Sequence, residues 1–301
     1  MKLVKIDTFD GKVNTVCVWD EVDNKIGAVV IVHGMAEHAE RYDAFARYLN
    51  KEGYVVLADN HRGHKYNPDG AKGIVSGDSF ANSVEDIKSV VDYAKSVYGL
   101  EVVLLGHSYG SFLSQRYIEL YAPSVKGVIL SGTAYMKGAL VGMAKIIAGV
   151  QKAFCGGEKT AYLIDKLSFG NYNKPFESQG QKFAWLSRDK SEVAKYEADE
   201  YCGYPLSIDY YYSFFKGVMA MYSDDAYAAA KDLPVMIAVG SDDPVSNRAV
   251  LAEKLYKFYS QKGLDVSYKV YPGARHEILN EINKKEVYAD MLAFIEARFA
   301  R

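Results

Sequence analysis

The sequence has few cysteines, little net charge and no long uninterrupted apolar run. Its 301 residues include three cysteines, which lie far apart at Cys17, Cys155 and Cys202. An odd number at these spacings indicates neither a disulfide framework nor a zinc cage. The formal net charge of −2 gives no electrostatic footprint for nucleic acid or for an anionic membrane. A secreted disulfide scaffold and a nucleic-acid-binding protein are therefore not expected.

No segment of the sequence has the pattern of a leader or of a membrane span. The N-terminal stretch meets Asp7 and Asp10 before any long apolar run, and a signal peptide needs such a run. The most apolar stretch, residues 139–150, is interrupted by Lys145 and is too short to cross a bilayer. We therefore expect a cytoplasmic protein.

Strand and helix patterns alternate along most of the chain. A continuous β-branched run at Ala28–His33 predicts a strand that is buried on both faces. Apolar residues at steps of three and four predict an amphipathic helix over residues 84–97. Further strands are predicted at residues 2–9, 12–19, 54–58, 102–105, 125–131, 234–239 and 266–271, and further helices at 41–51, 109–121, 249–259 and 286–299. This alternation predicts an α/β fold, with a mostly parallel sheet covered by helices on both faces.

The strand signal is absent from residues 135–232. This segment is helical by composition and contains an aromatic cluster at residues 210–215. A loop of this length without structure is rare in a compact domain, so we expect an inserted helical subdomain. Residues 1–134 and 233–301 would then form the core, and residues 135–232 a lid over the active site. The aromatic cluster would give the lid an apolar wall that accepts an acyl chain.

A nucleophile motif follows the strand predicted at residues 102–105. The next five residues are Gly106-His107-Ser108-Tyr109-Gly110, and a helical pattern comes directly after them. This is G-x-S-x-G in the strand–turn–helix context that the motif requires. A side chain two residues to either side of the serine would collide with the neighbouring strand or helix, which explains both glycines. The pattern predicts Ser108 as the nucleophile.

A serine nucleophile needs a base, and the base needs a group that fixes its tautomer. In this fold class the acid and then the histidine follow later strands. The last histidine of the chain, His276, comes after the strand at residues 266–271 and is the predicted base. Asp242 and Asp243 both follow the strand at residues 234–239, and neighbouring side chains point apart. We favour Asp243 as the acid and keep Asp242 as the alternative.

A tetrahedral intermediate also needs backbone N–H donors aimed at its oxygen. The residue after the nucleophile, Tyr109, should supply one of them. The loop after the strand at Ala28–His33 should supply the other, from the amide of Met35. The two histidines of the run at residues 61–64 have no acidic neighbour at ligand spacing, so a structural loop is expected there and no metal site.

Three runs of the sequence resemble one known family. They are His33-Gly34-Met35-Ala36-Glu37-His38-Ala39-Glu40-Arg41-Tyr42, Gly106-His107-Ser108-Tyr109-Gly110-Ser111 and Tyr271-Pro272-Gly273-Ala274-Arg275-His276-Glu277. These runs are similar to monoacylglycerol lipases and to the lysophospholipase-like α/β-hydrolases of bacteria. Residues 185–189 and 201–205 resemble the lid of the bacterial members, so the resemblance spans nearly the whole chain.

The resemblance implies the α/β-hydrolase fold, with an eight-stranded, mostly parallel sheet and a lid inserted after the sixth strand. It places the catalytic roles on Ser108, Asp243 and His276, with Met35 and Tyr109 as the oxyanion hole. In monoacylglycerol lipases the polar head of the ester is held near positions that match Glu37, Arg41 and His107 here.

These observations together predict a serine carboxylic-ester hydrolase that cleaves monoacylglycerol- or lysophospholipid-like esters through an acyl-enzyme on Ser108. Its partner is a small-molecule lipid ester, and no metal, organic cofactor or nucleic acid is expected. The tyrosine- and phenylalanine-rich lid suggests transient contact with membranes or micelles, although it lacks the basic face that anionic membranes favour. The protein would then be cytoplasmic and at times peripheral to membranes.

Two other functions stay open at this point. A serine aminopeptidase, similar to proline iminopeptidases, would use the same fold and triad. It would need lid carboxylates such as Glu192, Glu197 or Asp199 to hold a free amine. A non-catalytic ligand-binding protein on this fold is the other alternative, but such a protein has no physical need for all three groups of a triad.

Overall fold

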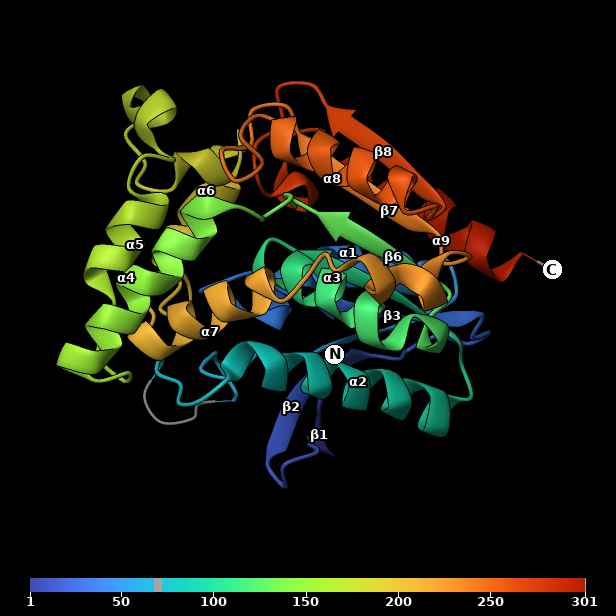
Figure 1. The fold of residues 1–301 in the computed structure, drawn as a ribbon. Helices are drawn as coiled ribbons and strands as arrows, with labels where there is room; N and C mark the ends of the chain where they lie inside the picture. The colour runs from blue at the N-terminus through green and yellow to red at the C-terminus, as the bar shows by residue number, and fades with distance from the viewer. Residues whose placement is uncertain (68–71, 301) are drawn as a thin grey trace.

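A twisted β-sheet forms the centre of the protein in a computed structural model that describes residues 1–67 and 72–300 (Figure 1). Within this part of the chain, eight strands form one sheet in the order β1-β2-β4-β3-β5-β6-β7-β8. Its strands are β1 (Lys2–Asp7), β2 (Val13–Trp19), β3 (Gly27–Val32), β4 (Tyr54–Ala58), β5 (Val102–His107), β6 (Gly127–Ser131), β7 (Val235–Gly240) and β8 (Val266–Tyr271). Strand β2 runs antiparallel to both β1 and β4, and the other neighbours are parallel. The predicted eight-stranded, mostly parallel sheet is confirmed.

Helices cover both faces of the sheet because successive side chains of its strands point to opposite sides. In the fully buried strand β3, Val30 joins the apolar core under one set of helices, and its neighbour Ile31 joins the core under the other. The first set consists of α2 (Ser79–Tyr98), α3 (Tyr109–Tyr121) and α8 (Val250–Gln261), and the second of α1 (Asp43–Lys51) and α9 (Lys284–Phe299). Short 3₁₀ helices lie at η1 (Ala39–Tyr42), η2 (Ala122–Ser124) and η6 (Ile278–Asn280).

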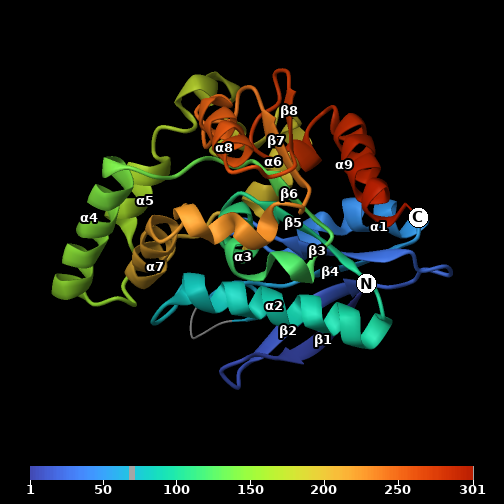
Figure 2. The same cartoon turned by 45° about the vertical axis from the view of Figure 1, so that its right-hand side comes forward.

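The chain between β6 and β7 is helical and contains no strand among its described residues. Figures 1 and 2 show α4 and α5 standing at one side of the molecule, with α7 between α4 and the sheet. The segment consists of α4 (Ala139–Cys155), α5 (Tyr162–Phe169), η3 (Lys174–Gln179), η4 (Ala184–Leu186), α6 (Lys190–Ala198), α7 (Ile208–Met219) and η5 (Asp224–Ala230). The exact limits of the lid, at residues 135 and 232, stay a prediction.

The loops that carry the predicted site residues follow the carboxyl ends of parallel strands. Met35 comes after β3, Ser108 after β5, Asp243 after β7 and His276 after β8. Because these strands run in the same direction, the four loops meet at one edge of the sheet, and the lid covers that edge. No helix among the described residues has the length and apolarity needed to cross a membrane.

Candidate active site

Ser108 occupies a strained turn between β5 and α3. Its backbone has φ 51° and ψ −119°, a conformation that residues with a side chain rarely adopt. A Cβ on Gly110 would lie 2.0 Å from the carbonyl oxygen of Val32, and one on Gly106 would lie 2.4 Å from the carbonyl oxygen of Gly110. Both glycines are therefore required for this close approach, and the turn presents the serine to a cavity at the sheet edge.

His276 lies on the wall of the same cavity and is held by Asp243. Its Nδ1 is 3.0 Å from Oδ1 of Asp243, and both side chains are buried. The same carboxylate oxygen accepts the backbone N–H of Val245 at 2.8 Å. The neighbouring Asp242 is exposed to solvent, so the structure places Asp243, and not Asp242, against the imidazole.

The environment of His276 determines its protonation. Burial by itself lowers the pKa of this imidazole, but the charge and the hydrogen bond of Asp243 outweigh it, and the pKa is raised above its ordinary value. With Nδ1 engaged by Asp243, the other ring nitrogen, Nε2, is the one available to the serine hydroxyl. The pair therefore has the arrangement of a general base and its orienting group.

The loop after β3 holds the Met35 amide at the cavity. The N–H of Gly34 donates to Oε1 of Glu37 at 2.6 Å, and the N–H of Ala36 donates to Nε2 of His64 at 3.1 Å. Within the described residues, the Met35 N–H has no acceptor in the chain. The Tyr109 N–H is the first of α3, where a helix leaves its amides without intrahelical partners. Both amides are thus left for an oxyanion.

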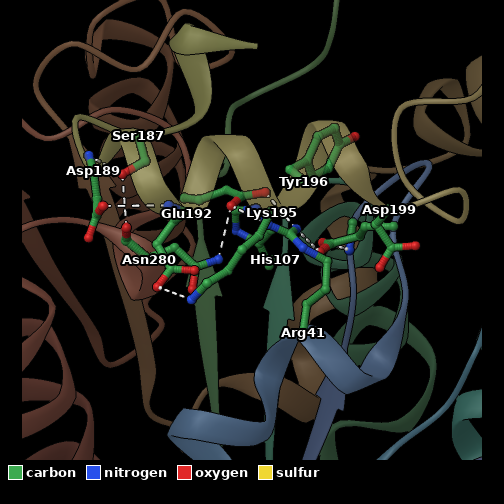
Figure 3. A network of polar contacts seen from close by, with 12 residues as sticks. Arg41, His107, Ser187, Asp189, Glu192, Lys195, Tyr196, Asp199 and Asn280 are labelled. Atoms are coloured by element: carbon green, nitrogen blue, oxygen red, sulfur yellow. Dashed lines mark hydrogen bonds and ion pairs between the residues drawn. The ribbon is translucent and has the colours of Figure 1, made fainter. Parts of the chain in front are cut away.

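Of the residues proposed for the polar head, Glu37 and His107 lie on the cavity wall and Arg41 lies behind them. Figure 3 shows Arg41 close to His107 and beneath Tyr196 of α6. The Arg41 guanidinium donates to both carboxylate oxygens of Glu277, at 2.7 and 2.6 Å, and also to Glu37. The Tyr196 ring covers it at 4.7 Å. Arg41 is therefore fully engaged and orients the two glutamates.

Glu277 was not recognised from the sequence. It follows His276 directly, and its partner Arg41 is 236 residues away. Burial by itself raises the pKa of Glu277, but the charge of Arg41 outweighs it and lowers the pKa to about 2. An acidic residue next to the predicted base was the only available signal. Arg41 therefore favours the charged form of Glu277 on the cavity wall.

His107 is the neutral member of this wall. Burial, and then the nearby His276, lower the pKa of His107 to about 4. Its Nδ1 lies 3.3 Å from Oγ of Ser131, and its ring centre lies 4.8 Å from that of His276. A neutral imidazole at this place can offer or accept one hydrogen bond from a ligand.

The cavity above these groups has a volume of about 680 Å³. The aromatic cluster expected in the lid contributes Tyr211, Phe214 and Phe215 to its wall, whereas Tyr210 packs against Tyr109 instead. Other aromatic side chains also line the wall, and the sequence analysis assigned none of them to the cavity. They are Phe112, Tyr162, Phe169, Tyr172, Phe183, Trp185, Tyr196 and Tyr204. The wall is largely apolar and suits an acyl chain.

One loop of the lid packs directly on the histidine loop. The Trp185 ring centre lies 5.2 Å from that of His276, and the Glu277 N–H donates to the Leu186 carbonyl at 2.8 Å. Arg275 donates to the Ala184 carbonyl at 2.6 Å. These contacts hold the lid beside the candidate base. No pattern in the sequence predicts them, because the partners are far apart along the chain.

The histidines of residues 61–64 serve the loops around the site. His61 bonds to Asp59 at 2.9 Å and to the His33 carbonyl, also at 2.9 Å. His64 accepts the Ala36 N–H, as described above. Their ring nitrogens are used within the chain, and the sequence analysis overlooked Asp59 as an acidic neighbour of His61.

Comparison with known proteins identifies the family. The model of the family described as "Serine aminopeptidase, S33" matches residues 23–283, and the chain belongs to this family. It is 29% identical over 286 residues to the monoacylglycerol lipase of Mycolicibacterium smegmatis, covering 92% of this chain and 91% of that one. It is 22% identical over 281 residues to phospholipase YtpA of Bacillus subtilis, with coverages of 92% and 97%.

Solved structures share the fold. The chain superposes on a carboxyl esterase from Bacillus coagulans, solved in complex with glycerol, with a TM-score of 0.87, 23% identity and 99% coverage of both chains. An identity this low shows the fold alone. The comparisons confirm the resemblance found in the sequence and identify the chain as a hydrolase of the α/β-hydrolase fold.

Proposed function

We propose that this hydrolase cleaves carboxylic esters of the monoacylglycerol or lysophospholipid type. The single observation that carries the proposal is the Asp243–His276 pair on the wall of an apolar cavity that also exposes the strained Ser108. A nucleophile, a base and an orienting acid on one cavity are what acyl transfer to serine requires.

The reaction would proceed through an acyl-enzyme. As Oγ of Ser108 attacks the ester carbonyl carbon, its proton passes to Nε2 of His276. The amides of Met35 and Tyr109 donate to the resulting oxyanion. His276 then protonates the leaving alcohol as the ester bond breaks. Water then attacks the acyl carbon of the acyl-serine while His276 accepts its proton. His276 returns this proton to Oγ of Ser108 as the bond to the serine breaks, which releases the carboxylic acid and the free serine.

The cavity supports a lipid ester with a small polar head. The aromatic wall from the lid would bury the acyl chain, and Glu37 and His107, with Arg41 behind them, would hold the hydroxyl groups of the alcohol. A relative is named monoacylglycerol lipase, another is named phospholipase, and a structural neighbour was solved with glycerol. These names agree with the same substrate class.

The aminopeptidase alternative takes support from the description of the family. The lid carboxylates that would hold an amine are used otherwise: Glu192 pairs with Lys284, Glu197 accepts the Phe183 N–H, and Asp199 bonds to His38. None of the three lies on the cavity wall, whose carboxylates are also engaged: Glu37 and Glu277 bind Arg41, and Asp165 accepts the Tyr211 hydroxyl at 2.8 Å. The structure therefore favours an ester over an aminoacyl substrate.

A substrate panel tests this choice. We expect hydrolysis of p-nitrophenyl esters of graded chain length, of monoacylglycerol and of lysophosphatidylcholine, because the wall is largely apolar and each of its carboxylates already has a hydrogen-bond donor. Aminoacyl-naphthylamides should be cleaved at least about a hundredfold more slowly, since an unpaired carboxylate for the amine is worth roughly 3 kcal/mol. Measured kcat/KM values for amides that equal or exceed those for esters would contradict the proposal.

The outer face of the lid is apolar and exposed. On α4 the side chains of Leu140, Ile146 and Phe154 are 79%, 66% and 86% exposed. Their spacing places them on one side of the helix, together with Met143 and Val150. Monomeric proteins rarely expose such a contiguous apolar face to water unless it contacts something. Figures 1 and 2 place α4 at the edge of the molecule.

We propose that this face docks on a neutral lipid surface, where the substrate resides. Tyr162 of α5 is 70% exposed and also lies on the cavity wall, so one exposed aromatic side chain of the lid reaches the cavity. The exposed positions of α4 hold no charged residue, and its two lysines, Lys145 and Lys152, are half-buried. This favours apolar insertion over attraction to anionic headgroups. The expected cytoplasmic location, with peripheral contact to membranes, stays a prediction.

Replacing Leu140, Ile146 and Phe154 together with serine should reduce turnover of monoacylglycerol in phosphatidylcholine vesicles at least about tenfold, since each side chain loses on the order of 1 kcal/mol of transfer energy. Hydrolysis of a short water-soluble ester should not change. As a control, serine at Ile26 and Val97, which are exposed on the core, should alter neither rate. If the triple variant instead only dissociated a dimer in sedimentation, the face would be an interface between copies.

A further inference from the structure

A second cluster of reactive side chains lies where the lid meets the loop after β3. It consists of His38 from that loop and of Asp199 and Cys202 from the lid segment after α6. One ligand atom from each residue, an imidazole nitrogen, a carboxylate oxygen and a thiol sulfur, lies within 4.8 Å of the other two. Among the described residues this is the group of three with metal-ligand spacing, and it is separate from Ser108 and His276.

The His38 ring faces a carboxylate on each side. Its Nε2 is 2.8 Å from Oδ2 of Asp199, and its Nδ1 is 3.6 Å from Oε2 of Glu40. The ring is buried, and Nδ1 has no hydrogen-bond partner among the described groups. A neutral imidazole carries one proton, so it can donate to only one of the two carboxylates. Within the described residues, Nδ1 is therefore a buried polar atom without a hydrogen-bond partner.

We propose that His38, Asp199 and Cys202 form a zinc site that ties the lid to the core. Nitrogen, oxygen and sulfur ligands together are the set that Zn²⁺ accepts, and three protein ligands leave a fourth position for water. Zinc on Nε2 would move the imidazole proton to Nδ1, where it faces Glu40. A carboxylate behind a ligating histidine is the usual way to orient the ring.

The surrounding charges are compatible with a cation. Lys65 is paired with Glu40, and the guanidinium of Arg41 is held by Glu37 and Glu277. Binding would form the zinc–sulfur bond as the Cys202 thiol releases its proton to water, so no oxidant or reductant is needed. Asp199 and Cys202 are partly exposed, which gives the ion a path from solvent.

A zinc ion at this place would cross-link the lid to the loop after β3. The Gly203 N–H donates to the Ala36 carbonyl at 2.9 Å, and the Tyr196 hydroxyl donates to the same oxygen at 3.1 Å. The lid segment that carries Asp199 and Cys202 therefore already contacts the loop that carries Met35. A bound ion would cross-link these two segments and raise the melting temperature of the chain.

Zinc titration of the Ser108→Ala chain by calorimetry and thermal melting tests the site without any contribution from turnover. We expect one equivalent of Zn²⁺ to bind and to raise the melting temperature. Bound Co²⁺ should show a thiolate-to-cobalt charge-transfer band. The Cys202→Ser variant should lose this band and bind zinc at least about a hundredfold more weakly. The matched Cys155→Ser variant, which changes an exposed cysteine, should keep both.

The Glu40→Gln variant probes the orienting carboxylate and should weaken zinc binding about tenfold. It leaves the buried His38 in place, so the test does not depend on the folding of a chain without this imidazole. Zinc affinity that survives Cys202→Ser unchanged, or bound cobalt without a thiolate band, would overturn the proposal.

Discussion

The Ser108→Ala variant is expected to lose ester hydrolysis by roughly 10⁴-fold or more while keeping the wild-type fold. Alanine has the same Cβ as serine and removes only Oγ, so the strain at φ 51° is unchanged. The amides of Met35 and Tyr109 remain and would support a small residual rate. Steady-state rates on a p-nitrophenyl ester, with circular dichroism as the check on folding, measure this loss.

A fluorophosphonate probe provides an independent readout of the same serine. It should label the wild type at Ser108 and leave the alanine variant unlabelled, because labelling needs a nucleophile activated by His276. A wild-type chain that stays unlabelled although it is folded would support the non-catalytic ligand-binding alternative. Comparable ester rates in both chains would refute the role of Ser108.

The second large effect is expected from the pair Asp243→Asn and Asp242→Asn. Asparagine at 243 keeps the shape of the side chain but removes the charge that holds His276, and kcat should fall by roughly 10³–10⁴-fold. Asparagine at 242 changes an exposed side chain and should alter kcat less than about twofold. Both variants have the same net charge, so each is the control for the other. Loss of turnover in the Asp242 variant alone would reverse the assignment.

The pH dependence of these variants follows from the pKa of His276. The imidazole must be unprotonated to act as a base, so activity appears as pH rises through its pKa. In the wild type Asp243 raises that pKa above the ordinary value against the effect of burial. Without the aspartate charge, burial dominates and lowers the pKa. The acidic limb of kcat/KM should therefore move to lower pH in Asp243→Asn and stay in place in Asp242→Asn.

Much of the core was predictable because its patterns are local. The strand predicted at residues 54–58 and the helix predicted at 109–121 have the bounds of β4 and α3. Differences are confined to element ends. The helix predicted over residues 41–51 begins as the 3₁₀ helix η1, and α1 starts only at Asp43. A 3₁₀ turn at a helix start keeps the same apolar spacing, so sequence periodicity does not distinguish the two.

The candidate triad was predictable for a different reason. G-x-S-x-G needs its glycines for steric reasons, and an acid and a histidine after later parallel strands must reach the same sheet edge. The choice between Asp242 and Asp243 depended on which side chain the loop after β7 turns inward. Only the folded chain shows that Asp243 is buried against His276 and that Asp242 is exposed.

The sequence by itself determined the mostly parallel α/β sheet and the turn that carries Ser108, because strand and helix periodicity and the G-x-S-x-G motif depend on neighbours within a few positions. The tertiary structure alone decided the Arg41–Glu277 pair, the contact of Trp185 with His276 and the meeting of His38 with Cys202. These partners are separated by 91 to 236 residues. Contacts over such separations depend on strand order and on how the lid packs, and neither leaves a periodic signal in the chain.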